Sequence, residues 1–178
     1  MIQTAEIITE TGFTALVKDY TVYNQWANTT LVRWLRSKPL EVLEKEIPSS
    51  FPGIKNTMVH IWDVERGWLA HIRGEVPPTS FRLVPFNGTL EEAIEGLLST
   101  SAAIENFVSD LTENELMEVI HIDIPYVKAD MARFEIIHHA MNHSTYHRGQ
   151  VTCMGHHVGL HDAPMTDYMF YVIRVKGK

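Results

Sequence analysis

Two histidines near the C-terminal end of the chain have the spacing of metal ligands. His143 and His147 are four residues apart, which places them about one turn apart on one face of a helix. In the surrounding segment, apolar residues recur with the helical period at Ile136, Ala140, Val151, Met154 and Val158. The two histidines take the positions in this series where leucine or isoleucine is expected. We therefore expect both imidazoles to face the protein interior, where they can hold one metal ion between them.

His60 is a third candidate ligand. It comes directly before Ile61 and four residues before Val64, which belong to the apolar stripe of another predicted helix. Three neutral imidazoles leave one position of a divalent ion open, as in catalytic zinc sites. The alternative is a set of hydrogen-bonded core histidines, but burying unmatched imidazoles is costly, which favours metal binding. Imidazole ligands also suit copper and iron, and we expect zinc or nickel.

Three further polar residues are candidate bases for catalysis. His139 lies one turn before His143 on nearly the same face, about 9 Å of helical rise from the midpoint of the ligand pair. That distance favours a role facing substrate over metal ligation, with an ordinary packed histidine as the alternative. Asp63 and Glu65 follow the third ligand candidate on its own helix. These carboxylates are therefore the nearest acidic candidates by sequence.

Several chemistries are excluded by the same residues. The residue after His143 is Ser144, so the His-Glu-x-x-His signature of metalloproteases is missing from the sequence. The chain also has neither a glycine-rich phosphate loop nor a Gly-x-Ser-x-Gly nucleophile elbow.

Arg148 is rotated by about 100° from His147, so we expect it to pair with a carboxylate of a neighbouring helix. Cys153 lies on another face and is predicted to be a buried structural thiol.

Four segments with helical periodicity must position these side chains. Apolar residues at spacings of three and four run over residues 13–34, 54–72, 90–111 and, from about Asp130, to Val158. Helix-breaking prolines and glycines separate the segments. Thr89 and Glu92 form a capping box at the start of the third segment. The stretch "VIHIDIP" alternates apolar and polar residues, which predicts one short strand or an extended connection. We predict a single all-α domain over residues 1–178, a four-helix bundle with long connecting loops.

Composition limits the partners of such a domain. The net charge of −7 argues against nucleic acid and anionic membranes, because both require a basic surface. The N-terminus lacks the layout of a signal peptide, and the apolar stretches are too short to span a bilayer. With one cysteine, no internal disulfide can form. We expect a cytoplasmic protein that acts on a small-molecule substrate.

Three blocks of the sequence resemble the DinB-like, or YfiT-like, family of metal-dependent enzymes. The blocks are "DYTVYNQWANTTLVRWL", "KNTMVHIWDVERGWLAHI" and "HAMNHSTYHRGQV", the last followed by "GLHDAPMTDYMFYV". The motif Asn-His-x-x-x-His-Arg-Gly-Gln is fairly specific, and the likeness spans nearly the whole chain. The resemblance implies a four-helix bundle, a divalent metal on His60, His143 and His147, and a homodimer.

The resemblance also implies a range of activities. The best-defined relatives are thiol-dependent transferases and isomerases that use low-molecular-weight bacterial thiols. A metal ion can hold a thiol as the nucleophilic thiolate without a separate base, so a metal-dependent S-transferase is our leading hypothesis. A metal-dependent hydrolase is the alternative, with His139, Asp63 or Glu65 as its base. A non-catalytic metal-binding protein of the stress response is the third possibility.

Overall fold

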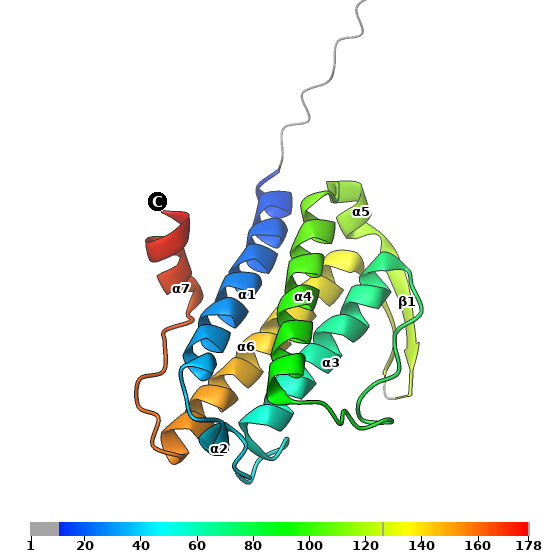
Figure 1. Ribbon diagram of the computed structural model, residues 1–178. Coiled ribbons are helices and arrows are strands. Elements are labelled where there is room, and N and C mark those ends of the chain that lie inside the picture. Colours follow the sequence, from blue (N-terminus) through cyan, green and yellow to red (C-terminus); the bar gives the residue numbers. More distant parts are fainter. Residues whose placement is uncertain (1–10, 126, 178) are drawn as a thin grey trace, which may run out of the picture.

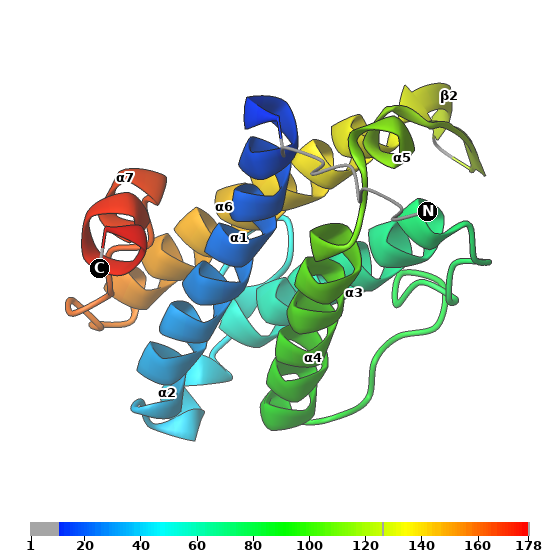
Figure 2. The same cartoon turned by 90° about the horizontal axis from the view of Figure 1, so that it is seen from above.

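Four long helices dominate the structure, a computed structural model that describes residues 11–125 and 127–177 (Figure 1). They are α1 (Gly12–Arg36), α3 (Gly53–Arg73), α4 (Leu90–Ser109) and α6 (Arg133–His157). Helices α1 and α3 each pack against both α4 and α6, and Figure 2 shows the bundle from above. The predicted all-α four-helix bundle is confirmed, and its helices coincide closely with the four periodic segments.

Local signals explain where these helices begin and end. The Thr89 side chain accepts a hydrogen bond from the Glu92 backbone, and the Glu92 side chain accepts one from the Thr89 backbone, which forms the predicted capping box of α4. Helix α3 ends at Gly74, whose φ of 71° is the left-handed conformation that favours glycine. Gly53, at the start of α3, has a φ of 88°, and a Cβ there would lie 2.6 Å from the Lys45 carbonyl oxygen. A side chain at this position would therefore disturb the entry to α3.

The fourth helix begins later than the sequence predicts. Strand β1 (Val119–Ile124) pairs antiparallel with β2 (Val127–Ala132), so Asp130 lies in a strand and α6 starts at Arg133. The predicted strand is therefore confirmed as β1, but the expectation of a single strand was wrong. A hairpin satisfies backbone groups that a lone strand would leave without hydrogen bonds. The remaining short elements are α2 (Leu40–Leu43), α5 (Glu113–Met117), α7 (Tyr168–Tyr171) and the π-helical turn η1 (Val172–Lys176).

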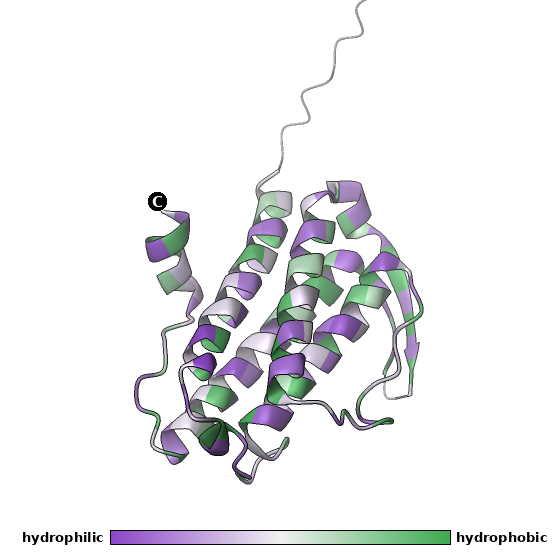
Figure 3. Cartoon of the chain, viewed as in Figure 1, coloured by the Kyte–Doolittle hydropathy of each residue, from purple (hydrophilic) through white to green (hydrophobic). Residues whose placement is uncertain are grey.

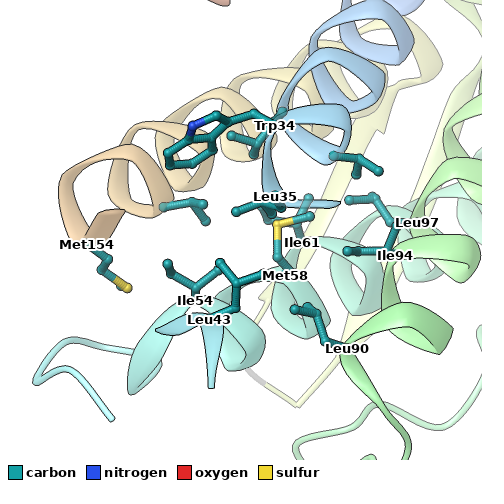
Figure 4. Packing of buried hydrophobic residues seen from close by; sticks show 13 residues of the cluster. Trp34, Leu35, Leu43, Ile54, Met58, Ile61, Leu90, Ile94, Leu97 and Met154 are labelled. Carbon is teal, nitrogen blue, oxygen red and sulfur yellow. The ribbon is translucent and has the colours of Figure 1, made fainter. Parts of the chain in front are cut away.

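The apolar core is divided along the bundle. Helices α1, α3 and α4 carry both polar and apolar residues, which divide between two faces as amphipathic helices require (Figure 3). One apolar cluster, near α2, includes Met58, Ile61 and Met154 (Figure 4). A second cluster, near α5, includes Leu69 and Met141. The polar layer between them on α3 and α6 carries the candidate site. No helix among the described residues is both long and apolar enough to cross a membrane.

Candidate metal centre

His60 on α3 meets His143 and His147 of α6 in this polar layer. The Nε2 atom of His143 lies 3.3 Å from Nε2 of His60 and 3.1 Å from Nε2 of His147. The ring nitrogens that the three residues offer all lie within 4.8 Å of one another. Two nitrogens bound to one zinc ion at tetrahedral geometry are about 3.3 Å apart, from bond lengths of about 2.0–2.1 Å. The observed spacing therefore fits one divalent ion.

The electrostatics of the centre favour neutral imidazoles. Burial, together with the neighbouring imidazoles, lowers the pKa of His60 to about 3 and that of His143 to about 4. Burial also lowers the pKa of His147. At neutral pH all three rings are therefore unprotonated and carry lone pairs, which is the form that binds metals. The positive charge of Arg82 contributes to the lowered pKa of each ring.

Hydrogen bonds and packing orient the rings. Gln150 Oε1 lies 2.7 Å from Nδ1 of His147, and because an amide oxygen only accepts, that Nδ1 carries the proton. The lone pair of His147 is then on Nε2, the atom that faces the other rings. The Phe51 ring stacks on His60 with centroids 3.6 Å apart and meets His147 edge-on at 5.6 Å. Phe51 thus shields this side of the centre from water.

The centre adjoins a pocket of about 610 Å³ whose wall includes His60 and His143. This volume is in the range of small-molecule sites. The remaining wall comes from α3, the loop that follows it and the turn of the β-hairpin. Its apolar part consists of Val64, Trp68, Leu83, Ile124 and the prolines Pro77, Pro78 and Pro125. A ligand in this pocket can reach the imidazoles of His60 and His143 along a mostly apolar surface.

His139 lines the pocket close to the centre. Its ring centroid lies 6.0 Å from that of His143 and 5.2 Å from the Trp68 ring. Desolvation by the surrounding protein lowers the pKa of His139, so the ring is neutral at pH 7 and can accept a proton. Of the three residues that the sequence suggests as bases, His139 has the most accessible side chain, because Asp63 and Glu65 are buried.

Asp63 also lines the pocket, but its carboxylate is already occupied. It accepts hydrogen bonds from Arg66 at 2.8 and 3.0 Å, from the Ser80 hydroxyl at 2.6 Å and from the Phe81 backbone at 3.0 Å. Arg66 also donates to the backbone carbonyl of Thr79. The buried carboxylate of Asp63 thereby fastens the loop that follows α3 to the helix.

Glu65 lies apart from the pocket in a fully buried network. Its carboxylate accepts hydrogen bonds from the amides of Asn24 at 2.8 Å and Asn28 at 2.9 Å. It also accepts from the hydroxyls of Ser101 at 2.6 Å and Ser144 at 2.7 Å. These donors come from α1, α4 and α6, so Glu65 joins all four long helices at the level of the histidines. Its oxygens are fully engaged with donors.

Arg148 completes this network from α6. Its guanidinium donates to the side-chain oxygens of Asn24 at 2.6 Å and Asn28 at 2.9 Å, and to the Thr145 hydroxyl at 2.7 Å. The expected direct carboxylate partner was therefore wrong, because two asparagine amides stand between Arg148 and Glu65. The sequence analysis did not identify these asparagines. The available signal was their spacing of four on the otherwise apolar face of a helix.

Cys153 is a further correction. The thiol is exposed on α6, whereas the sequence analysis predicted a buried one. Tyr146 and Gly149 precede Cys153 by seven and four residues on the same face, and both are exposed as well. No helix within the described part of the chain covers this face of α6, which periodicity alone could not reveal.

The fold and the site together define a four-helix bundle with three converging histidines beside a small-molecule pocket. The sequence profile of the DinB family matches residues 8–174. Protein DinB of Bacillus subtilis (strain 168) is 30% identical over 161 residues, which cover 86% of this chain and 92% of that protein. The chain belongs to the DinB family, so the resemblance seen in the sequence is confirmed.

Proposed function

We propose that this protein is a metal-dependent enzyme that transfers a small thiol to an electrophile, with one divalent ion held by His60, His143 and His147. The convergence of three Nε2 atoms beside a pocket, whose wall includes His60 and His143, carries this proposal. Zinc and nickel are the expected metals, because neutral imidazoles suit both. The thiol S-transferase activity rests on the family resemblance together with the donor set of the site.

A divalent ion held by the three histidines would supply Lewis acidity, which would lower the pKa of a thiol or a water toward neutrality. The chain prepares this centre in three ways. Burial keeps the imidazoles unprotonated, Gln150 fixes the tautomer of His147, and Phe51 excludes water from one side of His60. The pocket then holds the second reactant next to the thiol.

In the transfer, the thiol sulfur forms a bond to an electrophilic carbon of the second reactant. The bond from that carbon to its leaving group breaks, and the electron pair leaves with the group. The thiol proton passes to solvent before the attack, because a thiol held by the ion would be a thiolate at neutral pH and would need no separate base. This reaction requires no carboxylate base, in agreement with the full engagement of Asp63 and Glu65 by hydrogen-bond donors.

Hydrolysis is the second candidate, and the neutral ring of His139 favours it. In this reaction His139 would accept a proton from the attacking water. Replacing His139 with Ala separates the two reactions: hydrolysis would fall by about 10²–10⁴-fold, whereas thiol binding would be unaffected. A non-catalytic metal-binding protein would show neither hydrolysis nor thiol binding.

Thiol binding to the cobalt-loaded protein tests the proposal. Addition of 2-mercaptoethanol should produce a sulfur-to-cobalt charge-transfer band in the wild type and in the His121→Ala control, because His121 is exposed on β1 far along the chain from the three ligands. The band should be missing from the His143→Ala variant. Cobalt-loaded wild-type protein that binds no thiol at any concentration would refute the transferase proposal.

The homodimer implied by the resemblance is also part of this proposal. The side chains of Met169, Ile173 and Val175 in α7 and η1 are exposed, with 70%, 62% and 41% of their surface accessible. Exposed apolar side chains gathered at one end of a chain are suited to a subunit contact. Sedimentation equilibrium would show twice the mass of the chain for a dimer, and the chain mass for a monomer.

A further inference from the structure

Arg82 occupies a defined position in the wall of the pocket. The Arg82 backbone N–H donates to the Ser80 hydroxyl at 3.1 Å, and that hydroxyl donates to buried Asp63 at 2.6 Å. Arg66 packs against the Phe81 ring, with its guanidinium carbon 3.7 Å from the ring centroid. The two residues before Arg82 are thus held by groups of α3. This anchoring gives the arginine a preferred position at the pocket.

The guanidinium of Arg82 lies one aromatic ring away from the metal centre. It lies over the Phe51 ring, 5.4 Å from the centroid, and Phe51 stacks on His60. Its positive charge contributes to the lowered pKa of all three histidines. Arg82 is also the one arginine or lysine among the described residues that line the pocket.

The Arg82 side chain has no ion pair or hydrogen bond within residues 11–125 and 127–177. The acidic residue of the pocket, Asp63, is saturated by other donors and does not pair with it. A divalent ion on the histidines would place a second positive charge near Arg82. The ion and the Arg82 guanidinium would then repel each other across the pocket, and an anion bound between them would offset this repulsion. The loaded pocket therefore favours a negatively charged ligand.

The rest of the wall indicates what this ligand carries besides its charge. The side chains of Val64, Trp68, Leu83 and Ile124 offer apolar contacts, together with the three prolines. A planar guanidinium matches a carboxylate through two parallel hydrogen bonds, which a hydroxyl group cannot form. Charge and shape thus point to a small molecule with a carboxylate and a hydrocarbon part.

We propose that Arg82 binds the carboxylate of the ligand in this pocket, so that the enzyme selects carboxylate-bearing reactants with an apolar body. This inference rests on the proposed function, since it takes the pocket as the place where the reactants meet. The carboxylate belongs either to the thiol or to the electrophile. These two sources share the same recognition chemistry and are separated by the experiment.

The experiment is calorimetric titration of the zinc-loaded protein with two matched pairs of ligands. The thiol pair is 3-mercaptopropionate and 3-mercapto-1-propanol, and the second pair is 3-phenylpropionate and 3-phenyl-1-propanol. Wild-type protein is expected to prefer the carboxylate by about tenfold in at least one pair, the effect of one charge-assisted hydrogen-bonded contact. Arg82→Met should abolish the preference, and Arg82→Lys should retain part of it because the charge remains.

Arg73→Met is the matched control, because Arg73 is an exposed arginine of α3 outside the pocket wall. It should preserve the wild-type preference, and the zinc content of every variant should equal that of wild type. A preference confined to the thiol pair assigns the carboxylate to the thiol, and one seen with the phenyl pair assigns it to the electrophile.

The inference is overturned if neither pair shows a preference, or if Arg82→Met leaves the preference intact. Failure of the proposed function has a different appearance. In that case neither thiol binds through its sulfur, and the cobalt-loaded protein shows no sulfur-to-cobalt charge-transfer band. The phenyl pair, which has no sulfur, still measures the contribution of Arg82. Repeating the phenyl titrations on zinc-free protein separates the contribution of Arg82 from that of the metal.

Discussion

Replacing Glu65 with Ala is expected to destabilise the protein strongly without any direct contact with the pocket. Glu65 is fully buried and accepts hydrogen bonds from Asn24, Asn28, Ser101 and Ser144. Removing its carboxylate leaves these four donors with fewer acceptors. It also leaves the buried positive charge of Arg148 without a compensating negative charge.

The magnitude follows from the loss of one member of a buried charged network. Such a removal costs about 3–5 kcal/mol of unfolding free energy. For a chain of this size each kcal/mol lowers Tm by about 2–4 °C, so Glu65→Ala should lower Tm by about 6–20 °C. Glu65→Gln separates the two causes, because an amide oxygen can keep the acceptor at Oε1 while the charge is lost. We expect a smaller loss for Gln, of about 1–3 kcal/mol.

Urea unfolding followed by circular dichroism measures these differences. Glu91→Ala is the control, because Glu91 pairs with Arg36 on the surface, where an ion pair contributes about 1 kcal/mol or less. The reasoning is refuted if Glu65→Ala unfolds within about 1 kcal/mol of wild type. Equal losses for Ala and Gln would show instead that the charge, and not the hydrogen bonds, determines the stability.

Three further predictions follow from the site. Gln150→Leu removes the acceptor for Nδ1 of His147 and should weaken zinc binding by about 10–100-fold, measured by competition with a chelator. The metal-free protein should lose stability as pH falls from 6.5 toward 4, because burial holds the pKa of His60 near 3 and that of His143 near 4, so the unfolded chain binds more protons. This fall should be seen in urea midpoints and should be smaller in the His60→Phe, His143→Phe double variant. Asp63→Asn should release the loop after α3, which limited proteolysis would detect as faster cleavage within residues 76–84.

Each of these predictions has its own control. Gln25→Leu replaces a partly buried glutamine of α1 outside the site and should leave zinc affinity unchanged; equal zinc affinity in Gln150→Leu would contradict the tautomer argument. A stability that is flat between pH 6.5 and 4 would show that the imidazoles titrate normally. Asp110→Asn, at an exposed helix end, should leave the cleavage rate of the loop unchanged, and an unchanged rate in Asp63→Asn would contradict the anchoring role.

The periodicity of the sequence predicted the long helices because burial of one helix face imposes a repeat of apolar residues. The same repeat identified His143 and His147, since histidines in apolar positions must face the interior. Strand β2 was missed because "VKADMA" is short and its pairing depends on a partner segment. The start of α6 was then placed too early, at Asp130 instead of Arg133.

The parts of the site that come from loops could not be predicted. Phe51 and Arg82 lie in segments without periodicity, and the fold alone brings them to the histidines. The network of Glu65 and Arg148 was predicted only in part, because the sequence does not reveal which polar side chains stand between two buried charges. Asn24 and Asn28 occupy that place by virtue of how α1 packs against α3 and α6.

Elemental analysis of tag-free protein shows whether the three histidines hold a metal ion. We expect about one divalent ion per chain in the wild type and in the His121→Ala control, and almost none in His143→Ala and His147→Ala. Wild-type protein that binds no stoichiometric metal after reconstitution with zinc and with nickel would contradict the account. Equal metal content in the wild type and both ligand variants would contradict it as well.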